Sequence, residues 1–282
     1  MDIQSNQYLP LKEEYSFNIL PFDVLYLLTQ YDLKTFTAIR SVNRDIRDYT
    51  NEHMDVYKNR YLRVIRKEMR DKILEYTILP NGAKHGLYQE WRKDHVLIKR
   101  CFYADGLLDG LYQTFHWCNG SVSEECFYVK GNKVGEERKL TASGKFLEFN
   151  NYNDEGKLHG ISRRWDNNSY TLVAEINYSN GLKDGYETHY YADGKFMSQS
   201  TWDKGIQVGP HERHDNFYST ITLCFYVNGK IDGPYNDFYY SGNLKYHCNY
   251  VNGKVQGPQE WFDYQGRVTA REVNGRFRKI KY

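Results

Sequence analysis

The stretch that decides the fold spans residues 226–242, and its sequence is YVNGKIDGPYNDFYYSG. It holds a G-x-x-x-G pair, Gly229 and Gly233, and an asparagine precedes the first glycine. Asn-Gly between apolar runs is a strong hairpin signal, because both residues tolerate positive φ. The stretch therefore predicts two short strands joined by a tight turn.

The same glycine pair recurs along most of the chain. Successive second glycines lie 24 or 25 residues apart, which indicates a tandem repeat of eight units and a partial ninth at Gly275. No glycine occurs before residue 82, so the preceding residues form a separate region. The second glycines, which we expect to be structural in each unit, are Gly86, Gly110, Gly135, Gly160, Gly185, Gly209, Gly233 and Gly257.

Three side-chain columns follow from this spacing. The residues five positions after each second glycine are expected to build a core seam. Four cysteines share one column, and equivalent strands lie about 9–10 Å apart, too far for disulfides, so we expect small buried thiols. Tyrosines fill a third column, with the glycines leaving room for their rings. The seam column contains Trp91, Phe115, Leu140, Trp165, Tyr190, His214, Phe238 and Phe262, and the cysteines are Cys101, Cys126, Cys224 and Cys248.

These units resemble MORN repeats in their Y-x-N-G-K-x-x-G variant, over about residues 79–282. The resemblance implies a single-layer antiparallel β-meander of about eight hairpin repeats. Units three and six depart from the pattern at Lys139-Leu140 and His211 to His214.

The glycine-free N-terminal region has apolar residues at helical spacing. It divides into a tail (1–16), a helical module (17–50) and a connecting amphipathic helix (51–78) with a basic second face. The apolar face of that helix would carry Met54, Tyr57, Tyr61, Ile65, Met69, Ile73 and Tyr76. Together with the repeats this predicts an α+β protein.

Residues 17–50 resemble an F-box: Leu20-Pro21, then Asp23, a helix start at Asp32-Leu33, and Val42-Asn43-Arg44. Ile46 stands where many F-boxes have tryptophan. The resemblance implies binding to Skp1 and a cullin-RING ubiquitin ligase; without it, the segment is interpreted as a cap on the first repeat. The contact residues it implies are Leu20, Pro21, Val24, Leu25, Leu28, Ile39 and Val42.

Composition and motifs argue against several functions. The 38 basic and 36 acidic residues leave a net charge of +2, so we expect no nucleic acid partner and little membrane affinity. Five cysteines without C-x-x-C favour a reducing compartment, the cytoplasm. His211 and His214, and the carboxylates of Glu124-Glu125 and Glu136-Glu137, would point to opposite strand faces. We therefore expect no metal, no cofactor and no enzyme activity.

The predicted function is a protein-interaction adaptor, whose F-box-like module docks Skp1 and whose repeats bind a target protein. The order F-box then MORN is similar to that of proteins of large DNA viruses, which implies the host cytoplasm. The alternative is a structural scaffold, acting in assembly or at a membrane, in which the helices only cap the repeats.

Overall fold

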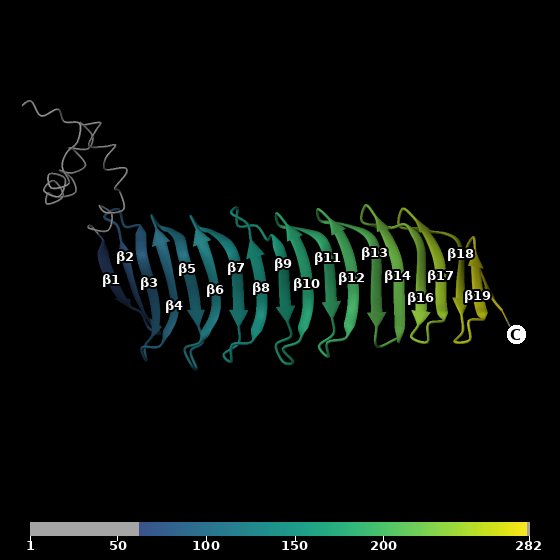
Figure 1. The fold of residues 1–282 in the computed structure, drawn as a ribbon, viewed down its shortest axis with the longest axis horizontal. Helices are drawn as coiled ribbons and strands as arrows, with labels where there is room; N and C mark the ends of the chain where they lie inside the picture. The colour runs from purple at the N-terminus through teal and green to yellow at the C-terminus, as the bar shows by residue number, and fades with distance from the viewer. Residues whose placement is uncertain (1–61, 281–282) are drawn as a thin grey trace, which may run out of the picture. The chain divides into compact units, whose positions relative to one another are not determined.

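The computed structural model describes residues 62–280, and these form one 20-stranded antiparallel sheet in a single layer (Figure 1). Each strand pairs with the next along the chain, and β15 and β16 together act as one interrupted strand beside β14. The strands are β1 (Arg63–Glu68), β2 (Lys72–Ile78), β3 (Lys84–Arg92), β4 (Leu97–Ala104), β5 (Leu107–Phe115), β6 (Val122–Val129), β7 (Asn132–Leu140), β8 (Phe146–Tyr152), β9 (Gly160–Trp165), β10 (Leu172–Ser179), β11 (Leu182–Tyr190), β12 (Phe196–Asp203), β13 (Ile206–Asp215), β14 (Thr220–Val227), β15 (Lys230–Ile231), β16 (Gly233–Tyr239), β17 (Leu244–Val251), β18 (Lys254–Phe262), β19 (Val268–Val273) and β20 (Arg276–Lys279).

The predicted α+β class is wrong for this part of the chain, since residues 62–280 contain no helix. The connecting helix expected over 51–78 is replaced from Arg63 onward by β1 and β2. Tertiary pairing decides the outcome, because β2 places Tyr76 opposite Tyr88 of β3 and their rings stack at 5.7 Å. A short run of apolar residues can fit either the helical repeat or the two-residue repeat of a strand, so the spacing alone did not distinguish a helix from a strand here. The module predicted at 17–50 lies outside the described residues.

Most of the first glycines of the pairs form two-residue hairpin turns. At Asn180-Gly181, φ is 51° and 86°, as a type I′ turn requires. The Gly181 amide donates to the Leu158 carbonyl at 2.7 Å, and Gly205 repeats the bond to Lys183 at 2.7 Å. Consecutive turns are thereby hydrogen-bonded along one edge of the sheet.

The second glycines lie at β-bulges. Glu125 pairs with Arg138 and Phe127 with Val134, so the strand carrying Gly135 holds two extra residues there. Gly135 has φ 68°, and no atom lies within 4 Å of a Cβ built on it. Backbone conformation, and not the expected room for rings, requires glycine at this position.

Cross-strand neighbours form a line across the middle of one face, which we call the central row, and nine of its fourteen side chains are buried. The expected seam is only half-buried by comparison. The cysteine prediction is confirmed, because Cys101 and Cys248 are fully buried, and all five thiols are free. The central row consists of Tyr88, Cys101, Tyr112, Cys126, Glu137, Asn150, Ser162, Ile176, Glu187, Ser200, His211, Cys224, Tyr235 and Cys248.

Within residues 62–280, no helix has the length and apolar character needed to cross a membrane.

Candidate functional site

The central row changes chemistry along the sheet. Tyrosines and cysteines alternate in it at both ends, as in Tyr88–Cys101 and Tyr235–Cys248. Its middle is mostly polar, with the carboxylates of Glu137 and Glu187 both buried. A single-layer sheet thus buries two carboxylates, and each needs compensating partners.

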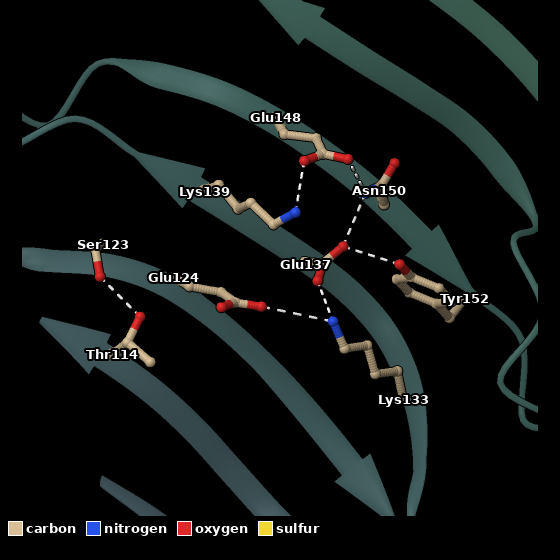
Figure 2. Close-up of polar contacts among 9 residues, drawn as sticks. All are labelled: Thr114, Ser123, Glu124, Lys133, Glu137, Lys139, Glu148, Asn150 and Tyr152. Atoms are coloured by element: carbon tan, nitrogen blue, oxygen red, sulfur yellow. Dashed lines mark hydrogen bonds and ion pairs between the residues drawn. The ribbon is translucent and has the colours of Figure 1, made fainter. Parts of the chain in front are cut away.

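Glu137 lies in the first of two Lys–Glu clusters (Figure 2). The Lys133 ammonium hydrogen-bonds one carboxylate oxygen, while Asn150 Nδ2 at 2.8 Å and the Tyr152 hydroxyl at 2.9 Å donate to the other. Lys133 also lies 3.5 Å from Glu124. A carboxylate that is only 2% exposed therefore has three donors.

The bulge explains why Lys133 meets Glu137. Four residues of regular strand would separate their Cα atoms by about 13 Å, whereas the two extra residues around Gly135 fold the strand locally. The signal in the sequence is K-x-G-x-E centred on a second glycine, which occurs at 133–137 and again at 183–187. Sequence reasoning missed it because it assumed unbroken alternation.

The partners set the charge of the first cluster. Burial raises the pKa of Glu137, but hydrogen bonds from Lys133, Asn150 and Tyr152 outweigh burial and lower it to about 2. Burial opposes the charge on Lys133, yet its hydrogen bond to Glu137 raises the pKa of the ammonium above its usual range. Both groups stay ionised near neutral pH, so Glu137 does not exchange protons there.

The second cluster repeats this arrangement two units along. Lys183 Nζ lies 2.6 Å and His189 Nε2 2.9 Å from Glu187 Oε1. The hydrogen bond from His189, joined by that from Lys183, lowers the pKa of Glu187 to about 2 against the effect of burial. The Lys183 ammonium also lies 4.6 Å from the ring centroid of Trp202, a cation–π contact.

Neither cluster is arranged for catalysis. Glu124, Cys126 and Glu137 bring three potential metal ligands within 4.8 Å of one another, but the Lys133 ammonium already contacts both carboxylates and occupies the place of a cation. Burial raises the pKa of the Cys126 thiol to about 11, so it is protonated at neutral pH and a poor nucleophile. The arrangement fits a stabilising ion pair.

The other residues considered from the sequence lie apart from one another. His211 Nδ1 contacts Ser200 Oγ at 2.8 Å, whereas His214 contacts Glu212 at 2.6 Å and the Phe196 ring. Glu124 contacts Lys133 while Glu125 accepts from Gln113, so this pair faces opposite sides as predicted. The residues predicted to contact Skp1 lie outside the described part of the chain.

A different feature projects from the edge opposite the hydrogen-bonded glycine turns. Three consecutive turns there expose Phe217, Tyr218, Tyr240 and Tyr264, which we call the aromatic turn edge. Phe217 is 87% exposed and packs against Tyr218 with ring centroids 4.8 Å apart.

Hydrogen bonds join these turns to one another. The Tyr240 hydroxyl donates to Asn216 Oδ1 at 2.7 Å, and Asn243 Nδ2 donates to the Tyr264 carbonyl at 2.7 Å. Tyr264 also stacks on Tyr239 at 4.0 Å. The turns are therefore held in one arrangement while Phe217 and Tyr218 stay accessible.

Exposed apolar residues at the glycine-turn edge have a simpler explanation. A Cβ built on Gly205 would lie 3.4 Å from Leu182, and one on Gly229 3.7 Å from Ile206. These side chains pack on the next turn along the sheet. The aromatic turn edge is thus the better candidate for a binding surface.

No protein-family model and no curated protein matches this chain. Among solved structures, it is weakly similar to TarM, with a TM-score of 0.24 and 12% identity over 57% of this chain and 30% of that one. A porin-like protein from Bacteroides uniformis has a TM-score of 0.19 and 11% identity over 78% of this chain and 92% of that one. The chain thus spans less than a third of TarM, and likeness of this degree establishes neither a shared fold nor a shared function.

Proposed function

We propose that the protein is a non-enzymatic adaptor whose aromatic turn edge binds a target protein. The observation that carries the proposal is the pair Phe217 and Tyr218, 87% and 66% exposed on a turn tied to its neighbours. Aromatic side chains dominate the energetic centres of protein interfaces, and a preorganised turn loses little entropy on binding. The two Lys–Glu clusters support the non-enzymatic part of the proposal, because their charged groups bind one another.

The test compares proteins captured from cell lysate by the full chain and by Phe217→Ser/Tyr218→Ser. The captured amount of at least one protein should be tenfold or more lower with this variant than with the parent chain. The matched control is Trp117→Ser, an exposed aromatic residue on an earlier turn of the same edge, and it should retain that protein. A partner set that is identical for all three baits contradicts the proposal. Loss of anionic-vesicle binding in the double variant would assign the edge to a membrane instead.

The F-box resemblance supports a second part of the proposal, that residues 17–50 dock Skp1. Purified Skp1 should bind the full chain at micromolar concentration, and Leu20→Ala/Pro21→Ala should abolish this binding. The Phe217→Ser/Tyr218→Ser variant should leave Skp1 binding unchanged. The Skp1-docking proposal and the target-binding proposal can therefore be refuted independently of each other. Absence of binding between the purified proteins refutes the docking half.

The scaffold alternative makes a different prediction. A protein that assembles through its sheet should form larger species as concentration rises. Light scattering after size exclusion measures this directly, and a strict monomer at high concentration contradicts the scaffold.

A further inference from the structure

The strand β20 ends the described sheet and pairs only with β19 among residues 62–280. All four of its residues are exposed. The Ile280 amide donates to the Thr269 carbonyl at 2.9 Å. In an antiparallel pair the backbone groups of alternate residues point to the partner strand, so those of Arg276 and Arg278 face β19. By that alternation, the backbone groups of Phe277 and Lys279 point away from β19 and leave an open edge.

The side chains of this edge are strongly basic. Arg276 pairs with Val273 and Arg278 with Arg271, so the three arginines lie on one face and line a shallow hollow. Arg271 has an ion pair with Glu260. No carboxylate of residues 62–280 lies within ion-pair distance of Arg276 or Arg278. Two guanidinium groups are therefore available to an acidic ligand.

The charge of the edge disfavours a second copy as the occupant. Arg276, Arg278 and Lys279 place three positive charges on four residues, in a chain whose net charge is only +2. Two β20 strands side by side would bring like charges directly opposite, which is destabilising. The strand at the other end, β1, is also basic, with the sequence RVIRKE, so β1–β20 pairing between copies is disfavoured too.

The opposite face of β20 adds an apolar contact. Phe277 is 53% exposed, and its ring lies 5.5 Å from that of Trp261. Alternate residues of an added strand face opposite sides of the sheet. A strand with acidic residues at i and i+2 could reach Arg276 and Arg278, while the apolar residue between them would cover Phe277.

We propose that β20 binds an extended acidic segment of a partner protein, which adds to the sheet as its next strand. The segment has the pattern acidic–apolar–acidic, its carboxylates contacting Arg276 and Arg278 and its backbone pairing with Phe277 and Lys279. This mode of recognition takes affinity from main-chain bonds and specificity from alternate side chains. The proposal is independent of the aromatic turn edge.

The test uses the full chain and a fluorescent peptide of alternating Glu and Val, with binding followed by anisotropy at about 50 mM salt, where the Debye length is still about 10–15 Å. Arg276→Gln/Arg278→Gln should weaken binding at least tenfold. The matched control, Arg66→Gln/Lys67→Gln on β1, removes the same charge at the other end of the sheet and should change affinity less than twofold. Equal losses in both variants would mean nonspecific attraction and overturn the proposal.

Two further arms separate strand addition from simple charge. A peptide N-methylated at alternate residues on its pairing edge should bind at least tenfold more weakly, and unchanged binding overturns the proposal. The Phe217→Ser/Tyr218→Ser variant should bind the acidic peptide as well as the parent chain. If it does not, the peptide binds the aromatic turn edge and the assignment to β20 is wrong.

Discussion

Replacing Lys133 with methionine should destabilise the middle of the sheet far more than a surface lysine substitution would. The change keeps an unbranched chain one atom shorter but removes the ammonium that binds Glu137. Breaking a buried ion pair on one side costs about 3–5 kcal/mol. Lys133 is itself partly exposed and Asn150 and Tyr152 still donate to Glu137, so we expect the low end, about 3 kcal/mol.

Native-state amide hydrogen exchange measures this locally. A loss of about 3 kcal/mol corresponds to roughly 100-fold faster exchange, and it should appear in β7 and β8. Strands β17 to β19 should keep their rates, because repeat arrays couple mainly between neighbours. Lys157→Met is the matched control, since Lys157 pairs with Glu155 at 2.7 Å with both side chains exposed, and it should leave exchange unchanged.

A second substitution tests the cause of the effect. Adding Glu137→Gln to Lys133→Met removes the uncompensated charge and keeps one oxygen, which can accept from both Asn150 and Tyr152 as Glu137 Oε2 does. The double variant should recover at least tenfold of the lost protection. If it exchanges as fast as Lys133→Met, or if that variant resembles Lys157→Met, the ion pair is not what stabilises this region.

Two other predictions concern acid and thiols. The pKa of Glu137 and of Glu187 is lowered from 4.5 to about 2 in the folded protein, so their stabilisation is complete above about pH 4.5 and is lost as pH falls toward 2. The unfolding temperature of the parent chain should drop across that pH window, and that of Glu137→Gln/Glu187→Gln should drop less. Equal drops in the two proteins would contradict the assignment of the acid sensitivity to these two carboxylates. Iodoacetamide at pH 8 should label exposed Cys118 first, because the other four cysteines are buried. Mass spectrometry showing a second thiol labelled at the same rate would refute this.

The glycine spacing predicted the hairpin units well because it reports backbone conformation directly. Positive φ at Asn180 and Gly181 is what an Asn-Gly turn requires, and no distant contact is needed to specify it. The cysteine column followed from the same spacing. Local chemistry was therefore sufficient for the turns and for the period of the sheet.

The segment before residue 79 shows where local signals fail. Ile73 and Tyr76 fit one face of a helix, yet β3 offers them cross-strand partners in Trp91 and Tyr88. Pairing with a sheet that already exists outweighs the spacing of a few apolar residues. The Lys–Glu clusters were missed for a related reason, because a bulge brings together residues that regular alternation keeps apart.

The bulge also explains how one repeat position accepts different chemistry. In the first unit Lys84, two residues before its glycine, places its ammonium 4.6 Å from the ring centroid of Tyr88, two residues after it. Lys133 and Glu137 occupy the same two positions, with a carboxylate in place of the ring. In both, the lysine ammonium meets a group that attracts its charge, an aromatic face in one and a carboxylate in the other. In the units of Gly86, Gly135 and Gly185, the bulge thus brings a lysine onto a central-row residue of its own strand, whether that residue is a tyrosine or a glutamate. A sheet built this way can vary its turns without disturbing its core, which is the property that a binding surface along a turn edge requires.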